Sequence, residues 1–205
     1  MSHDAYPVFL RLEGRKILVV GAGPVAAEKT QKLVASGASI RVVAPEASEA
    51  FLELGLDVAL RPFDEADLDG VFFVVAAAPP DVNRRVYHAC ERRGLFVLAV
   101  DDPSHASAFG GAVVKRGDVT VLVGTGGRAP ALAGLLREAL DDLLPHDLGT
   151  WVDVASALRP RLAALGLSFA DRRRALLGTL VRRHCEARGC TRESAPASPQ
   201  PGASS

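Results

Sequence analysis

Five short apolar runs, separated by segments of helical periodicity, occupy the first half of the chain and restrict its fold more than any other feature. Each run is nearly continuous in Val, Ile, Leu, Phe or Ala, as expected for strands that are buried on both faces of a sheet. The runs are Lys16–Val20, Ile40–Val43, Val58–Leu60, Val71–Ala76 and Phe96–Val100. Alternating strands and helices are typical of βαβ units, so the sequence predicts an α/β fold with a Rossmann-type, doubly wound parallel sheet.

Three of the segments between the runs end at a glycine, which can supply the left-handed cap that closes many helices. The helices expected there are Val25–Ser36 before Gly37, Pro45–Leu54 before Gly55 and Asp81–Arg93 before Gly94.

Beyond the fifth run the pattern changes to a hairpin followed by helices. Gly111–Lys115 and Val119–Val123 flank a short glycine turn, which is typical of an antiparallel pair. The hairpin and the leucine face of Leu132–Leu143 form an apolar surface that the sheet domain has little room to cover, which predicts a homodimer. Two more helices are expected over Leu148–Leu165 and Phe169–Arg188.

The net charge of zero hides an uneven distribution. Up to Thr150 the chain has 15 Lys and Arg against 20 Asp and Glu, and after Thr150 it has 9 against 4. A basic segment can face an anionic ligand or form a solvated helical face, and composition alone favours the second interpretation.

The cysteines and the N-terminus indicate a soluble, cytoplasmic protein. Cys90, Cys185 and Cys190 form neither a disulfide framework nor a CxxC pair. His184 and the two later cysteines match no zinc-site spacing, so no metal site is expected. The N-terminus has no charged region followed by an apolar run, and no stretch approaches the roughly 18 apolar residues of a membrane span. We expect neither a membrane nor a nucleic acid as a partner.

A glycine-rich segment, Gly21-Ala22-Gly23-Pro24-Val25-Ala26, directly follows the first strand and opens the first helix. This G-x-G-x-x-A pattern predicts a dinucleotide site. Gly21 permits the tight turn, Gly23 lets the backbone approach a pyrophosphate, and Ala26 allows close packing of helix and sheet. The phosphates would lie at the helix N-terminus. The alternative, a tight turn without a ligand, is disfavoured by the strand before the loop and the four strands after it.

Glu46 follows the second strand, 23 residues after Gly23. This spacing is close to the offset of about 20 residues at which a carboxylate binds a ribose hydroxyl in dinucleotide folds. A carboxylate at this position would repel a 2′-phosphate, so NAD is the expected cofactor rather than NADP. Arg41 lies inside the strand and is not obviously available to bind such a phosphate.

The end of the fifth strand carries two acids, Asp101 and Asp102, followed by Pro103. Ligands bind outside the carboxyl ends of strands in open α/β sheets, so these acids are candidates for proton transfer. The alternative is ordinary turn chemistry before a proline, and the two interpretations are equally supported at this point. His105 can share the same pocket or be solvated.

A second glycine segment, Thr125-Gly126-Gly127-Arg128, leads into the leucine-striped helix. Two glycines, a cation and a helix N-terminus together predict an anion cradle. A flexible loop before a capped helix is the alternative.

Taken together, these motifs resemble the precorrin-2 dehydrogenase module of the siroheme synthase family, in order and at matching intervals. The resemblance extends over about Tyr6 to Arg188. The segments that carry it are Tyr6–Leu10, Gly21–Lys29, Val100–Pro103, Ser107–Phe109 and Thr125–Ala133.

The resemblance implies NAD-dependent oxidation of precorrin-2 to sirohydrochlorin on the route to siroheme. Some members also insert iron, so ferrous iron is a further candidate substrate. The family's catalytic aspartate falls on Asp101. Its cofactor contacts fall on the glycine loop, including Pro24 and Val25, and on Pro45 and Glu46.

The family fold also implies how the chain is divided. We expect an NAD-binding Rossmann domain at 1–110, a dimerisation segment of hairpin plus helix at 111–147, a helical C-terminal domain at 148–190 and a disordered tail at 191–205. Precorrin-2 carries many carboxylates, so arginines in the basic part of the chain would stabilise it. These arginines are Arg159, Arg161, Arg172, Arg173 and Arg174.

The chain also departs from the family pattern. Ala78-Pro79-Pro80 replaces a usual Thr-Asp pair, Leu98 replaces a common Asn, and Gly110-Gly111-Ala112 interrupts a Phe-x-x-Pro run. A chelatase without dehydrogenase activity and a non-enzymatic NAD-sensing module therefore stay as alternatives. A short-chain dehydrogenase is excluded, because neither tyrosine is followed four residues later by the required lysine. A serine that is phosphorylated in some relatives falls on Thr125.

Overall fold

The computed structural model describes residues 5–100 and 102–187 of the 205-residue chain. The chain forms two compact units. One consists of the chain through Ala112 together with Leu122–Arg137, and the other consists of Val113–Val121 together with the chain from Glu138 onward. The domain boundaries expected from the sequence stay a prediction.

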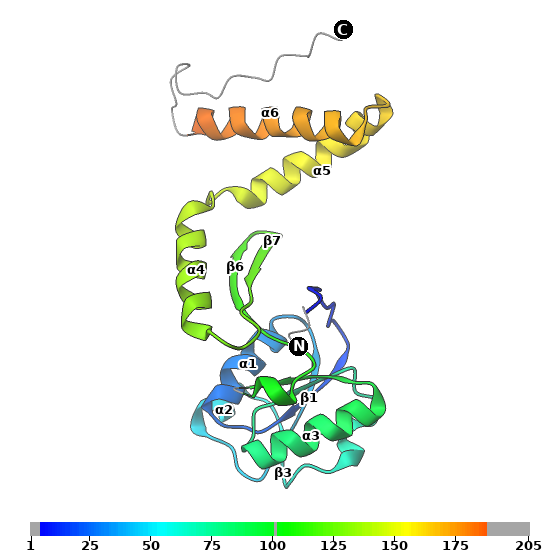
Figure 1. Ribbon diagram of the computed structural model, residues 1–205, viewed down its shortest axis with the longest axis vertical. Coiled ribbons are helices and arrows are strands. Elements are labelled where there is room, and N and C mark those ends of the chain that lie inside the picture. The colour runs from blue at the N-terminus through cyan, green and yellow to red at the C-terminus, as the bar shows by residue number, and fades with distance from the viewer. Residues whose placement is uncertain (1–4, 101, 188–205) are drawn as a thin grey trace. The chain divides into compact units, whose positions relative to one another are not determined.

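The first unit is built on a five-stranded parallel sheet with the strand order β3-β2-β1-β4-β5. This order confirms the predicted doubly wound α/β sheet. Figure 1 labels two of these strands, β1 and β3, together with the helices α1, α2 and α3 of the same unit. The strands are β1 Lys16–Val20, β2 Ser39–Ala44, β3 Val58–Leu60, β4 Phe73–Ala76 and β5 Phe96–Ala99. Because β1 has β2 on one side and β4 on the other, the chain reverses its winding direction there. The crevice beyond the carboxyl ends of β1 and β4 is where open α/β sheets bind ligands.

Both faces of the sheet are covered, which explains why the strands are apolar without alternation. On one face Leu18, Val43 and Val74 form a core with residues of α3 (Pro80–Arg93). On the other face Val19 and Val42 form a core with residues of α1 and α2, including Phe51 of α2. Helix α1 spans Pro24–Val34 and α2 spans Glu49–Leu52.

The segment after β2 differs from the expected helix over Pro45–Leu54, because α2 begins only at Glu49. The side chain of Ser48 accepts a hydrogen bond from the Phe51 amide and so acts as the N-cap. Residues 45–47 are therefore free to form a loop. The glycine stop of α3 is as predicted, since Gly94 has φ of 64° and closes the helix in the left-handed conformation.

Within the described ranges, the remaining elements are one hairpin, three helices and two short 3-10 turns. Their bounds are η1 Glu65–Leu68, η2 Pro103–His105, β6 Ala112–Arg116, β7 Val119–Val123, α4 Pro130–Leu143, α5 Leu148–Ala164 and α6 Phe169–Ala187. Within the second unit, the turn glycine Gly117 packs against Gly149 of α5, and Arg116 forms an ion pair with Asp141 at 2.7 Å. The tail expected to be disordered, 191–205, lies outside the described residues. None of the helices among the described residues is long and apolar enough to cross a membrane.

Candidate functional site

The turn between β1 and α1 depends on Gly21. Its φ is 105°, a conformation that side chains disfavour, and its amide donates to the Val43 carbonyl oxygen at 2.9 Å. A Cβ at this position would overlap the carbonyl oxygen of Ala77. Gly21 therefore allows the loop after β1 to lie directly against the loop after β4.

Gly23 has a different role, because nothing lies within 4 Å of where its Cβ would be. It precedes α1 with φ of −78°, and no side chain caps this helix. The first-turn amides, which have no partner inside a helix, are thus open to an anion. Ala26, one turn further on, is fully buried against the sheet, as expected for the small residue of the motif.

A cavity of about 680 Å³ opens at this edge of the sheet. Its volume lies within the range of small-molecule and cofactor sites. The loops after β1, β2, β3 and β4 and the first half of α3 line it. Five of the seven sequence-predicted cofactor residues are among the lining: Gly21, Gly23, Pro24, Pro45 and Glu46. The other two, Val25 and Ala26, are not part of the lining. Val25 is half exposed on α1, and Ala26 packs into the core.

Two polar side chains fix the loops around this cavity. The Ser48 hydroxyl donates to the Ala22 carbonyl oxygen at 3.0 Å and so ties the loop after β2 to the glycine loop. The buried side chain of Asn83 accepts from the Ala78 amide at 3.0 Å. In this way Asn83 holds the loop after β4, whose Ala78-Pro79-Pro80 sequence offers no capping side chain.

The lining of the cavity is mostly apolar and carries two charged side chains, Glu46 and Arg85. Glu46 lies in the loop after β2, where the sequence predicts a contact with ribose. Arg85 projects from α3 and was not anticipated from the sequence.

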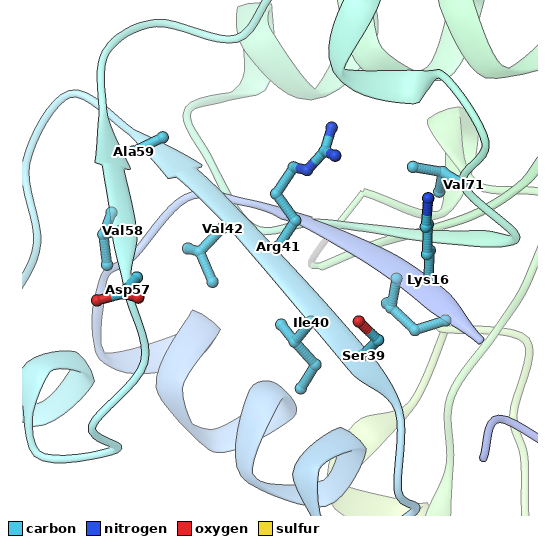
Figure 2. Close-up of a pocket in the computed structure, with 10 residues that line it drawn as sticks. Lys16, Ser39, Ile40, Arg41, Val42, Asp57, Val58, Ala59 and Val71 are labelled. Atoms are coloured by element: carbon cyan, nitrogen blue, oxygen red, sulfur yellow. The ribbon is translucent and has the colours of Figure 1, made fainter. Parts of the chain in front are cut away.

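A second cavity of about 480 Å³ lies across β1, β2 and β3, and Arg41 and Lys16 extend to the same side of the sheet there (Figure 2). Its lining contains no glycine loop and no first turn of a helix, so it lacks the features that bind a dinucleotide. Arg41 lines this second cavity and not the first. Its position agrees with the expectation that Arg41 is unavailable to a 2′-phosphate.

Asp101, the predicted catalytic residue, lies outside the described residues. Next to it in sequence, Asp102 Oδ2 lies 2.8 Å from His105 Nδ1. The His105 ring also makes edge contacts with the rings of Tyr87 and His88 on α3, at centroid distances of 5.6 and 6.1 Å. Asp102 is thus paired, and the turn after β5 is held against α3.

The second glycine segment adopts a loop that requires its glycines, since Gly126 has φ of 60° and Gly127 has φ of 74°. The Thr125 hydroxyl accepts from the Ala129 amide at 3.2 Å at the start of α4. A Cβ on Gly127 would lie 2.7 Å from Pro103 Cγ. The structure therefore brings the predicted anion cradle against the turn that follows β5, and Arg128 lies exposed in the same loop.

Within residues 5–100 and 102–179, whose side chains the structure describes, no group of three or more His, Cys, Asp or Glu is arranged to hold a metal ion. Burial raises the pKa of the Cys90 thiol to about 11, so this thiol stays protonated at neutral pH. Cys190 lies outside the described residues.

The arginines that we expect to face the substrate lie on two helices of the second unit. Arg159 and Arg161 belong to α5, and Arg172, Arg173 and Arg174 belong to α6. Their contact with a substrate stays a prediction.

Sequence reasoning missed Ser48, Asn83, Arg85 and the Asp102–His105 pair. The spacing of Ser48 before an apolar residue is a capping signal that could have been found. Asn83 and Arg85 carry no comparable signal, because their roles depend on which face of α3 meets the loops.

The sequence is similar to a family of NAD(P)-binding proteins and to siroheme synthases. Residues 8–112 match a family model described as putative NAD(P)-binding. Siroheme synthase 2 of Aeromonas salmonicida is 40% identical over 174 residues, which is 83% of this chain and 36% of that protein. Siroheme synthase of Salmonella typhi is 38% identical over 176 residues, with coverages of 83% and 38%. This chain therefore spans little more than a third of the length of these relatives.

Among solved structures, SirC, precorrin-2 dehydrogenase, superposes with a TM-score of 0.65 and 27% sequence identity. The match covers 84% of this chain and 88% of that chain. The similarity thus extends through the sheet domain into the elements that follow it.

Proposed function

Because the chain belongs to the family of putative NAD(P)-binding proteins, we propose that it is an NAD-dependent dehydrogenase that oxidises precorrin-2 to sirohydrochlorin. The observation that carries this proposal is the glycine-loop cavity, with Gly23 open and Glu46 in its lining. The likeness to a precorrin-2 dehydrogenase and to siroheme synthases supports the choice of substrate. We propose a cytoplasmic location for the same reaction.

The residues present fit a dinucleotide. Gly23 leaves space for a pyrophosphate at the uncapped N-terminus of α1, beside Gly21 and Pro24. Pro45 and Glu46 then receive the adenosine ribose, with the Glu46 carboxylate accepting hydrogen bonds from its hydroxyls. The chemistry that bound NAD⁺ supplies is hydride acceptance from precorrin-2.

The chain's own residues must handle the proton, because removing two hydrogens from a tetrapyrrole releases a proton as well as a hydride. In this proposal Asp101 accepts that proton at the end of β5. Thr125, Gly126, Gly127 and Arg128 bind carboxylates of the substrate, next to the turn that Pro103 begins. The close approach of Gly127 to Pro103 supports a position for this loop beside the turn that follows β5.

Incubation of the full chain with precorrin-2 and NAD⁺, followed by absorbance spectroscopy, tests the proposal. We expect the substrate spectrum to convert to that of sirohydrochlorin together with stoichiometric NADH. Binding of NAD⁺ without turnover would instead support a nucleotide-sensing module. Subsequent addition of ferrous iron to enzyme and sirohydrochlorin, against a no-enzyme control, measures iron insertion separately.

A further inference from the structure

The arginines of α3 fall into two groups. Arg92 Nη2 lies 2.6 Å from Glu65 Oε1, and Arg93 Nη1 lies 2.6 Å from Asp69 Oδ1. Arg84 and Arg85, by contrast, have neither a hydrogen bond nor an ion pair with any side chain that the structure describes, that is, within 5–100 and 102–179. Two guanidinium groups on the same helix are therefore without a protein partner in the described part of the chain.

Of these two, Arg85 lines the glycine-loop cavity and Arg84 does not. Arg85 precedes Arg92 by seven residues, which is about two helical turns, so both project from the same face of α3. Since Arg92 contacts Glu65 of η1, this face is turned toward the segment that follows β3. Pro62 and Phe63 of that segment line the same cavity. Arg85 therefore lines the same cavity as the loop that follows β3.

The other groups of the cavity already account for the polar parts of a dinucleotide. The open N-terminus of α1 suits the pyrophosphate, and Glu46 suits the ribose hydroxyls. The same cavity also has an apolar wall that includes Pro62, Phe63 and Val82. An aromatic base is the part of the ligand that fits such a wall. A guanidinium group is planar and weakly hydrated, and it stacks favourably on aromatic rings.

We propose that Arg85 recognises the adenine of the cofactor by stacking its guanidinium plane on the ring, next to the apolar lining residues Pro62 and Phe63. This inference rests on the proposed function of the cavity as the NAD site. It assigns a specificity role to a residue that neither the glycine motif nor the family resemblance singles out.

Calorimetric titration of the full chain with NAD⁺, ADP-ribose and nicotinamide mononucleotide tests the assignment. We expect Arg85→Ala to weaken binding of NAD⁺ and ADP-ribose by roughly tenfold, within the range of a desolvated cation–π contact. Nicotinamide mononucleotide, which lacks adenine, should bind Arg85→Ala as it binds the wild type. Arg85→Lys should show much of the same loss, because an ammonium group keeps the charge without the stacking plane. Arg84→Ala is the matched control and should bind all three ligands normally.

The possible outcomes separate this inference from the proposed function. A wild-type chain that fails to bind NAD⁺ counts against the proposed function itself. If the wild type binds and Arg85→Ala binds equally well, the adenine assignment is wrong. A loss that Arg85→Lys restores, and that added salt abolishes, identifies a phosphate contact and also overturns stacking. Since Arg85 is exposed, Arg85→Ala and Arg85→Lys should both unfold at the wild-type temperature. If Arg85→Ala unfolds at a lower temperature, the binding data for Arg85→Lys alone decide between stacking and a phosphate contact.

Discussion

Gly21 and Gly23 are two residues apart, and we expect a substitution at each of them to have a different effect. We expect Gly21→Ala to destabilise the fold, because its Cβ would overlap the Ala77 carbonyl oxygen at a φ of 105°. Gly23→Ala should fold normally, since its Cβ would meet open space, and should weaken NAD⁺ binding by filling the pyrophosphate position. Thermal unfolding and calorimetry measure the two effects. Equal melting temperatures for both variants would contradict this distinction.

Asp101 is the residue on which the proposed proton transfer depends. Asp101→Asn should lower turnover by roughly 10²-fold or more while leaving NAD⁺ affinity nearly unchanged. Asp102→Asn is the neighbouring control, but it removes the negative charge that lies 2.8 Å from His105 Nδ1. Its turnover must therefore be expressed per folded molecule, and on that basis it should fall much less. A folded Asp101→Asn protein with near-wild-type turnover would refute the assignment, and His105 would be tested next.

Glu46 determines the choice of cofactor in this interpretation. Its carboxylate lines the cavity, and Arg41 lines the other cavity, so a 2′-phosphate would meet repulsion from Glu46 without compensation from Arg41. We expect the wild type to bind NAD⁺ more tightly than NADP⁺, and Glu46→Ser to narrow the difference. Calorimetry with both dinucleotides measures this. Equal affinities in the wild type would be inconsistent with the proposed ribose contact.

At the scale of elements, the 3-10 turn η1 is anchored by a buried carboxylate. Asp67 Oδ2 accepts from Arg61 Nη1 at 2.8 Å and from the Asp64 amide at 2.9 Å, and its side chain is 4% exposed. The Arg61 guanidinium holds the pKa of Asp67 below its usual value. The pKa of Asp67 is therefore lower in the folded than in the unfolded chain. The pair stabilises the fold fully above about pH 4, the usual pKa of an aspartate, and this stabilisation is lost as the pH falls through the pKa of the folded state.

Asp67→Asn should therefore lower the free energy of unfolding at pH 7 by about 1–3 kcal/mol. Urea denaturation should show the difference from wild type shrinking below about pH 4, as the pH falls through the lowered pKa of the folded carboxylate. Asp69→Asn is the control, since Asp69 forms an exposed pair with Arg93 whose expected contribution is at most about 1 kcal/mol. A deficit in Asp67→Asn that does not change with pH would rule out the charge as its cause.

The elements show which parts of the molecule could be predicted from sequence. Continuous apolar runs identified all five strands of the parallel sheet, and the pattern is strongest in β1 and β4, which lie inside the sheet and are buried on both faces. The expected helix over Pro45–Leu54 was too long. The hydrogen bond from the Phe51 amide to the Ser48 side chain makes Ser48 the N-cap, so the helix begins only after Ser48. The glycine loop and Glu46 could be placed by spacing from β1 and β2. The position of Arg85 in the cavity could not be predicted, because it depends on which face of α3 is turned toward the loop after β3.

At the scale of the whole molecule, α4 presents several leucines that are exposed within the described part of the chain. Leu132 is 50% exposed, Leu135 63% and Leu143 77%, and they recur at helical spacing along one helix. Isolated apolar residues are common on protein surfaces, but a row along one helix is typical of an interface. We propose that this leucine face pairs with the same face of a second copy, as closed twofold dimers require.

The homodimer prediction is tested by light scattering at micromolar concentration. The wild type should have twice the mass of the chain. Leu135→Glu should shift the protein toward the monomer, because two carboxylates would be buried against each other in a twofold interface. Leu60→Glu is the matched control, since Leu60 is 68% exposed on β3, far along the sequence from α4. This variant should remain dimeric. A monomeric wild type, or a Leu135→Glu variant as dimeric as the control, would show that the leucines of α4 do not form the interface.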